Sequence, residues 1–185
     1  MKTFVEIGAC DFDTCLPLAK NGWSGLLIEP VQELYNNLVE QAAPYPFVQV
    51  ANVVCSDYIG EIDFNISTGE EWTRGISSVA SPNHKGGNLF EYQDGMNRKF
   101  LKETRKLPCY TLDKILEMYN IRDIDYLKLD TEGHERNILE SYSWSVHPSF
   151  IKLEHAHIDD IWMKNFLEQK GYIVYVEQQD IYAIG

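Results

Sequence analysis

The sequence predicts an α/β fold: a mostly parallel β-sheet with helices on both faces and one antiparallel strand near the end of the chain. Two observations predict it. Short apolar runs typical of buried strands alternate with amphipathic helical patterns along most of the chain. The last two apolar runs, residues 172–176 and 181–184, are separated by only four polar residues, which is typical of a hairpin. A chain of 185 residues suits one domain, so we expect a single domain over residues 1–185.

The chain begins with an apolar run at residues 3–8, which predicts a buried strand that contains one acid, Glu6. Gly8 follows at the turn, where a residue without a side chain lets a ligand approach the backbone closely. Asp13 or Thr14 can cap a helix, which we expect over residues 13–22. Strand, glycine turn and helix together form the first half of a nucleotide-type site at the carboxyl edge of an open α/β sheet.

The later elements follow from the same patterns. Further buried strands are expected at residues 26–28, 47–55, 125–130 and 150–154. Helices are expected from Val31, from a Thr111 cap, after residues 131–135, and from Ile158 to a stop at Gly171. Residues 61–67 alternate polar and apolar side chains and should form a half-exposed antiparallel strand. Residues 68–106 are polar and weakly periodic, and we expect this insertion to be a lid or a substrate-binding loop.

The composition argues against several classes of function. The chain has 16 basic and 28 acidic residues, a net charge of −12, and no strongly basic stretch, which argues against binding to nucleic acid or to an anionic membrane. The cysteines form no C-x-x-C pair, so we expect reduced thiols in a cytoplasmic protein. No apolar run approaches the roughly 20 residues of a membrane span, and none has the form of a signal peptide.

Several expected strands end on an acid; these acids are Glu6, Glu29, Asp130 and Glu154. The carboxyl ends of parallel strands meet at one edge of a sheet, so these acids should face a common crevice. Glu29 lies about 20 residues beyond the glycine turn, the spacing at which an acid accepts hydrogen bonds from ribose hydroxyls. Alternatively, Glu29 caps the next helix, with Pro30 in its first turn.

The glycine turn is not a dinucleotide fingerprint, because Cys10 and Asp13 stand where G-x-G-x-x-G requires glycine. The acids of the turn would repel a pyrophosphate but attract a nucleoside that carries positive charge. S-adenosylmethionine has an adenosine, an amino group and a sulfonium, and no phosphate. Its cationic groups would be attracted to one or more of four acids, Glu6, Asp11, Asp13 and Asp130.

Several sequence blocks resemble, in order, those of the FkbM-type methyltransferases. They are EIGACDFDT (residues 6–14), IEP (28–30), VCSD with a following glycine (54–60), LKLDTEGHE (127–135) and LEH (153–155). The fourth block is the most specific, and the blocks span nearly the whole chain. This chain departs from the family in having Glu6 where Asp is usual, and Cys10-Asp11-Phe12 where Asn-x-Gly is usual.

The resemblance implies a Rossmann-like class I methyltransferase fold, with a seven-stranded sheet in the order 3-2-1-4-5-7-6 and strand 7 antiparallel. It also implies S-adenosyl-L-methionine as donor, with S-adenosyl-L-homocysteine as product. The acceptor would often be a hydroxyl on a sugar or a secondary metabolite. The residues that it implies for the donor site are Gly8 and Ala9 (backbone approach), Cys10, Glu6 (methionine amino group), Asp13 and Thr14 (methionine carboxylate end), Glu29 and Pro30 (ribose), Ser56 and Asp57 (adenine), and Asp130.

Asp130 and Glu132 are expected beside the methyl group and the acceptor. Methyl transfer is an in-line displacement that largely needs positioning, and an alcohol acceptor would also benefit from a general base. The candidate bases are Asp130, Glu132, His134 and His155, and pKa matching favours a histidine. His155 and His157, with Glu154 or Asp130, could instead bind a divalent metal, but no fixed-spacing motif supports this and we predict no metal.

We therefore predict a methyltransferase that uses S-adenosylmethionine and methylates oxygen on a sugar, a glycan or a small metabolite. One alternative is a non-catalytic protein of the same fold that binds a partner through residues 68–106, as Phe12 in the glycine loop would suggest. The other is a nicotinamide-dependent oxidoreductase, against which the missing second glycine argues.

Overall fold

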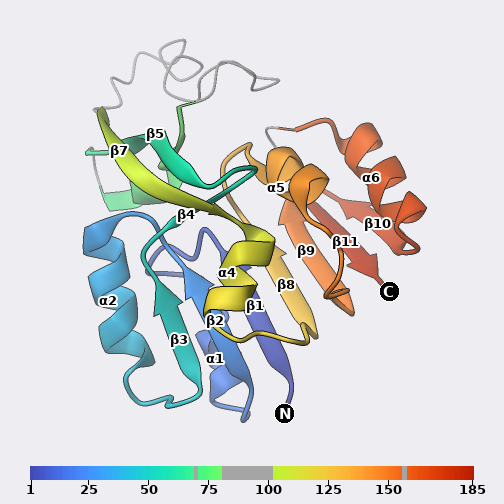
Figure 1. Ribbon diagram of the computed structural model, residues 1–185, viewed down its shortest axis with the longest axis horizontal. Helices are drawn as coiled ribbons and strands as arrows, with labels where there is room; N and C mark the ends of the chain where they lie inside the picture. The colour runs from blue at the N-terminus through green and yellow to red at the C-terminus, as the bar shows by residue number, and fades with distance from the viewer. Residues whose placement is uncertain (69–70, 81–101, 156–157) are drawn as a thin grey trace.

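The computed structural model describes residues 1–68, 71–80, 102–155 and 158–185. These parts of the chain form two β-sheets and the helices that pack against them (Figure 1). The main sheet has seven strands, and the small sheet has four. The small sheet lies beyond the carboxyl ends of the central strands of the main sheet, so the two sheets meet at the edge where the sequence predicts a site (Figure 1).

The main sheet has the predicted strand order. Its strands follow one another as β10-β11-β9-β8-β1-β2-β3, which is 3-2-1-4-5-7-6 when read from β3. All neighbours pair in parallel except β11, which runs antiparallel to both β9 and β10. The strands are β1 (Thr3–Ile7), β2 (Ser24–Ile28), β3 (Val48–Ala51), β8 (Tyr126–Leu129), β9 (Phe150–Glu154), β10 (Ile173–Glu177) and β11 (Asp180–Ile184).

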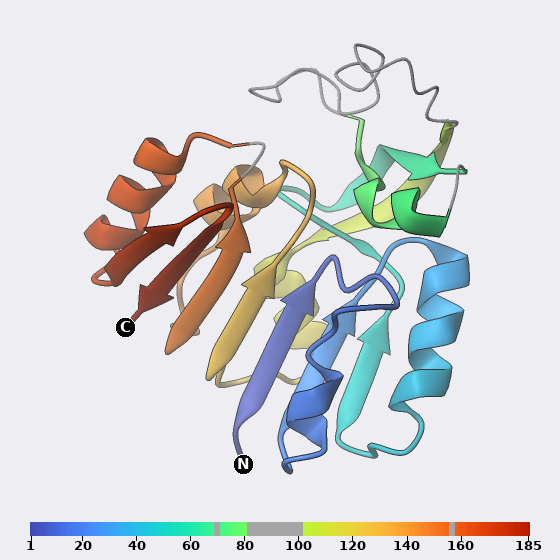
Figure 2. The same cartoon turned by 180° about the vertical axis from the view of Figure 1, so that it is seen from behind.

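Helices pack on both faces of the main sheet, as predicted. One face packs against α4 (Leu112–Met118), α5 (Glu135–Ser141) and α6 (Asp160–Gln169), and the other against α1 (Leu16–Ala19) and α2 (Gln32–Ala42). Alternation along β1 assigns Val5 to the first core and Phe4 to the second. Figure 2 shows α1 and α2 over the side of the sheet that holds β1 to β3. No described helix is long and apolar enough to cross a membrane.

The small sheet has the order β4-β7-β5-β6, and the 3-10 helix η1 (Glu71–Ile76) precedes β6. Its strands are β4 (Val54–Ser56), β5 (Gly60–Ser67), β6 (Ser78–Val79) and β7 (Lys102–Thr111). β5 is antiparallel to both of its neighbours, which confirms that part of the prediction for residues 61–67. The predicted alternation of exposed and buried side chains is wrong, because all side chains from Phe64 to Ser67 are buried. Val54, Phe64 and Cys109 pack here against Val31 and Leu34 at the start of α2, and this apolar contact joins the two sheets.

The prediction of one strand over residues 47–55 is wrong, because the chain there contributes β3 to the main sheet and β4 to the small sheet. Asn52 lies between them. Its side-chain amide donates to the carbonyl oxygens of Glu29 and Pro30, at 3.0 and 3.1 Å, and so fixes the bend. Within the predicted insertion, 71–76, 78–79 and 102–106 form η1, β6 and the start of β7, while 69–70 and 81–101 lie outside the described residues.

The first helix is shorter than predicted and begins at Leu16 rather than Asp13. Asp13 has a left-handed backbone, with φ 52°, and its carbonyl accepts a hydrogen bond from Lys128 Nζ at 2.7 Å, so it cannot continue a helix. The N-cap is Cys15 instead of Asp13 or Thr14, and it makes no side-chain cap. The Thr14 hydroxyl accepts a 3.3 Å bond from the Leu16 amide just before the helix. The predicted Thr111 cap of α4 is confirmed.

Candidate active site

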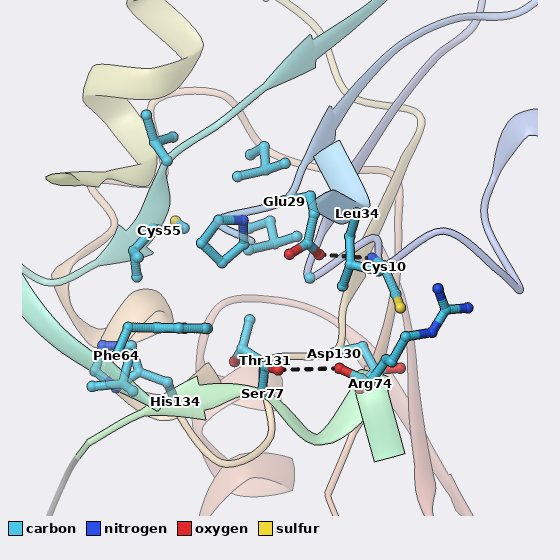
Figure 3. A pocket seen from close by; sticks show the side chains of 17 residues that line it. Cys10, Glu29, Leu34, Cys55, Phe64, Arg74, Ser77, Asp130, Thr131 and His134 are labelled. Carbon is cyan, nitrogen blue, oxygen red and sulfur yellow. Dashed lines mark hydrogen bonds between the residues drawn. The ribbon is translucent and has the colours of Figure 1, made fainter. Parts of the chain in front are cut away.

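A pocket lies at the carboxyl ends of β1, β2 and β8, between the main sheet and the small sheet (Figure 3). Its volume is about 40 Å³, enough for only a few water molecules, so a larger ligand requires its walls to separate. The main-sheet wall includes Ile7, Gly8, Cys10, Ile28, Glu29, Pro30, Asp130, Thr131 and His134. The opposite wall includes Val54, Cys55, Phe64, Arg74, Ser77 and Val79.

The two ends of the pocket differ in chemistry. Cys55, Phe64 and His134 lie at one end, and Cys10 and Arg74 lie at the other (Figure 3). Glu29 lies between these ends on one side of the pocket, and Asp130 lies on the other side (Figure 3). The pocket is therefore elongated, with a largely apolar end, two acids along its length and a cationic end.

Gly8 places the end of β1 directly against the end of β8. Its backbone is left-handed, with φ +78°, and an ideal Cβ at this position would lie 1.8 Å from the carbonyl oxygen of Asp130. The amides of Gly8 and Ala9 both donate to the carbonyl of Ile28, at 3.0 and 3.1 Å. Glycine is thus required here by two features of the protein itself, a positive φ and a close approach to Asp130.

The carboxylate of Glu29 is buried and ties the glycine turn to the start of α2. One oxygen accepts the Cys10 amide at 2.9 Å, and the other accepts the Val31 amide at 2.7 Å. Burial raises the pKa of Glu29 to about 7, although the two amides act in the opposite direction. The alternative that Glu29 caps this helix, with Pro30 in its first turn, is wrong, because α2 begins at Gln32 with Val31 as its N-cap and no side-chain cap. Glu29 instead holds the Val31 amide just before the helix and lines the pocket.

The structure places Glu6 away from the pocket, contrary to the expectation that it faces the methionine amino group. Glu6 is fully buried on the face that packs against α1, where it pairs with Lys128 at 2.9 Å and accepts the Cys15 amide at 2.7 Å. Burial alone would lower the pKa of Lys128, but the Glu6 carboxylate outweighs it and the pKa is raised. A charged partner from the neighbouring strand thus accounts for an acid inside this core.

Asp13, Thr14 and Ala9 also lie outside the pocket. The Asp13 side chain is 88% exposed, and Asp13 and Thr14 face a separate groove beside α1. Ala9 is buried in the core with α1 and α2. Of the expected donor-site residues, the structure brings together Gly8, Cys10, Glu29, Pro30 and Asp130.

An acidic group lies where β8 and β9 end. Carboxylate oxygens of Asp130, Glu132 and Glu154 all lie within 4.8 Å of one another. Burial, and secondly Glu132, raise the pKa of Asp130 to about 6. Glu135 holds the turn that carries these acids, since it accepts the amides of Thr131 and Gly133 at 2.6 and 3.1 Å. Because the pKa of Asp130 lies close to neutral pH, its carboxylate is well suited to act as a general base.

His134 lines the pocket and is the first of three linked polar side chains. Its Nε2 lies 3.0 Å from the hydroxyl of Ser56, and that hydroxyl donates to Asp57 at 3.0 Å. Ser56 and Asp57 do not line the pocket, and their expected place beside the adenine stays a prediction. They contact the apolar end of the pocket through His134.

His155 lies at the end of β9 and does not line the pocket. Its amide donates to the carbonyl of Gln179 at 2.7 Å, and its buried Nε2 has no hydrogen-bond partner among the described residues. His157, its partner in the alternative metal site, lies outside the described residues. The sequence predicted no specific role at the pocket for Ser77, Phe64 or Val79, and it predicted Arg74 only as part of the lid or substrate-binding insertion. The pairing of the small sheet is what brings these residues to the pocket. The sole signal was their place in or next to the insertion.

Comparisons with known proteins agree with this architecture. The profile of the methyltransferase FkbM domain matches residues 6–174. The chain is similar in structure to a methyltransferase FkbM from Methylobacillus flagellatus KT, with a TM-score of 0.63 and 12% identity. The match covers 100% of this chain and 43% of that protein, so this chain spans less than half its length. A search of curated proteins found no match.

Two further solved structures are similar at a TM-score of 0.50. One is precorrin-6y C5,15-methyltransferase from Geobacter metallireducens GS-15, with 11% identity over 99% of this chain and 78% of that one. The other is the human methyltransferase 10 domain containing protein, with 13% identity over 100% of this chain and 70% of that one. At these identities the likeness concerns the fold, and the predicted Rossmann-like class I methyltransferase fold is confirmed.

Proposed function

Because this chain belongs to the FkbM methyltransferase family, we propose that it transfers a methyl group from S-adenosyl-L-methionine to a hydroxyl oxygen of a sugar, a glycan or a small metabolite. The observation that carries the proposal is the position of the pocket. It lies beyond the carboxyl ends of β1, β2 and β8. From β1 the sheet extends in one direction through β2 and β3 and in the other direction through β8 and β9, so the strand order reverses between β1 and β8. Open α/β sheets bind their ligands at such a switch point.

The residues of the pocket suit this donor, which when bound supplies a methyl group on a positively charged sulfur. The end formed by Cys55, Phe64 and Val79 is apolar and suits the flat adenine ring. Each oxygen of Glu29 accepts one amide and retains a second lone pair, which suits a ribose hydroxyl. In this assignment Ser56 and Asp57 act on the adenine end through His134, and Glu6, Asp13 and Thr14 support the loop and helix behind the site.

Asp130 is the proposed general base. It lines the pocket, and its raised pKa of about 6 lets it take a proton from an acceptor hydroxyl near neutral pH. His134 is less suited because its Nε2 is engaged with Ser56, and His155 does not line the pocket. Glu132 and Glu154 flank Asp130, and their negative charge would favour its protonated form after proton transfer.

The described part of residues 68–106 is the proposed cover of the site. Arg74 and Ser77 lie on the wall opposite Glu29 and Asp130, and they come from η1 and the residues that follow it. Outward movement of this wall would admit the donor, and its return would exclude water from the reacting atoms.

The first experiment is a calorimetric titration of S-adenosylmethionine and S-adenosylhomocysteine into the purified protein. We expect micromolar binding, and a Glu29→Ala variant should bind more weakly by about 1–3 kcal/mol. Glu40→Ala, an exposed acid on α2, is the matched control and should bind like the wild type. Glycans and hydroxylated metabolites are then screened for methylation by mass spectrometry. A folded protein that binds neither compound up to millimolar concentration would contradict the proposal and favour the non-catalytic alternative.

A further inference from the structure

Two residues of the loop after β1 contact two consecutive residues of η1. Asp11 Oδ2 lies 3.1 Å from Arg74 Nη1, and an ideal Cβ on Gly75 would lie 3.2 Å from Cζ of Phe12. Asp11 and Phe12 belong to the segment that departs from the family pattern. The loop and η1 therefore meet at the cationic end of the pocket, where Cys10 and Arg74 line it (Figure 3).

The carboxylate of this ion pair is held in place, whereas the guanidinium is more accessible. The Asp11 side chain is 8% exposed, and that of Arg74 is 33% exposed. From α2, Asn37 Nδ2 donates to Asp11 Oδ2 at 2.8 Å, and Gln41 Nε2 donates to the Asp11 carbonyl at 2.9 Å. Asp11 is thus a fixed anion beside the pocket, and Arg74 is a cation that lines it.

Of the four acids that could attract the cationic groups of the donor, Asp11 is the one that pairs with Arg74, although Asp11 itself lies beside the pocket and does not line it. Glu6 is paired with Lys128 inside the core, and the Asp13 side chain is exposed outside the pocket. Asp130 lines the pocket and is labelled beside Arg74 in Figure 3. The cationic end therefore offers one fixed carboxylate and one guanidinium, in contact with each other.

Such a pair is complementary to a zwitterion. A ligand with an ammonium and a carboxylate on the same carbon replaces each partner by a group of equal charge and leaves no charge unpaired. The guanidinium can bind the carboxylate through two parallel N–H bonds.

We propose that Arg74 and Asp11 form the subsite for the amino-acid end of the donor, with Arg74 binding its α-carboxylate and Asp11 its α-ammonium group. This assignment rests on the proposed use of S-adenosylmethionine. It places the adenine at the apolar end of the pocket and the amino acid at the opposite end, with Glu29 and Asp130 between. It also gives η1, which belongs to the insertion, a direct part in recognising the donor.

The test compares three ligands by calorimetry: S-adenosylhomocysteine, its decarboxylated analogue, and 5′-methylthioadenosine, which lacks the amino-acid end. Arg74→Gln should weaken S-adenosylhomocysteine about tenfold or more, the usual effect of losing a charged hydrogen bond. It should not weaken the other two ligands. Asp11→Asn should weaken both ligands that carry the amine and leave 5′-methylthioadenosine within about twofold of the wild type.

Arg105→Gln is the matched control, because Arg105 lies on β7, pairs with Glu103 and does not line the pocket. It should change none of the three affinities, and a thermal melt confirms that each variant is folded. Unchanged binding of S-adenosylhomocysteine to Arg74→Gln, or equal weakening of all three ligands, would overturn the subsite while the proposed function stands. A wild type that binds none of the three would instead end the proposed function, and the subsite with it.

Discussion

The carbonyl oxygen of Asp130 occupies the space that a side chain on Gly8 would need, 1.8 Å from the position of an ideal Cβ. The contact joins the ends of β1 and β8, the two strands whose carboxyl ends carry the glycine turn and the acidic group. The residue that opens the glycine turn is therefore fixed by the packing of the protein itself, before any ligand is considered.

Gly8→Ala should lower the free energy of unfolding by about 3 kcal/mol or more, because it adds a steric overlap to the cost of a left-handed backbone, about 1–2 kcal/mol. Gly22→Ala is the control. Gly22 has a similar φ of +82° but no atom within 4 Å of its ideal Cβ, so it should incur only the backbone cost. Urea unfolding measures both variants, and equal losses would show that the overlap with Asp130 relaxes freely.

Lys128→Met should destabilise the protein by about 3–5 kcal/mol, because it leaves the Glu6 carboxylate buried without its partner. The double variant Glu6→Gln/Lys128→Met should recover part of that loss. Lys114→Met removes an exposed pair with Glu117 and should cost less than about 1 kcal/mol. Similar losses for the two lysine variants, measured by urea unfolding, would mean that Glu6 does not depend on Lys128.

The raised pKa of Glu29, about 7 against an ordinary 4.5, predicts a pH dependence of stability. The folded state binds this proton more tightly than the unfolded state, so the free energy of unfolding should fall as pH rises from 4.5 to about 7. The fall attributable to Glu29 is at most about 3 kcal/mol and should disappear in Glu29→Gln. Urea unfolding at a series of pH values measures it, with Glu40→Gln as control. Parallel profiles for Glu29→Gln and the wild type would contradict the assignment.

Asp130 should control the pH dependence of methyl transfer if it acts as the base. With a pKa of about 6, the rate at saturating donor should rise through pH 6 and level off above it. Asp130→Asn should lower the rate by about 10²-fold or more and remove this rise. Initial rates between pH 5 and 8 test it once an acceptor is known. A variant that keeps the wild-type profile would move the base to another group.

The predictions for the main sheet succeeded where the determining pattern is local. Apolar runs, helical periodicity and the hairpin spacing each lie within a few residues, and handed parallel connections leave few arrangements of such elements. The small sheet could not be predicted in this way, because its pairings are distant in sequence: β4 pairs with β7 across 55 residues, from Val54 to Cys109. The division of residues 47–55 depends on Asn52 reaching back to Glu29 and Pro30, which no periodicity records.

The sequence by itself determined the fold class, the strand order through its family blocks, and the placing of Glu29 and Asp130 at one edge, because the ends of parallel strands converge. Only the tertiary structure decided which acids reach the pocket. Glu6 lies on a strand whose neighbouring residues are apolar on both faces, so the sequence pattern does not show to which face its side chain points. The ion pair with Lys128 on the adjacent strand β8 decides this. Arg74 reaches the cationic end of the pocket through η1 and its contact with Asp11, an ion pair between residues 63 positions apart. Contacts over such distances depend on the whole fold and leave no local pattern in the chain.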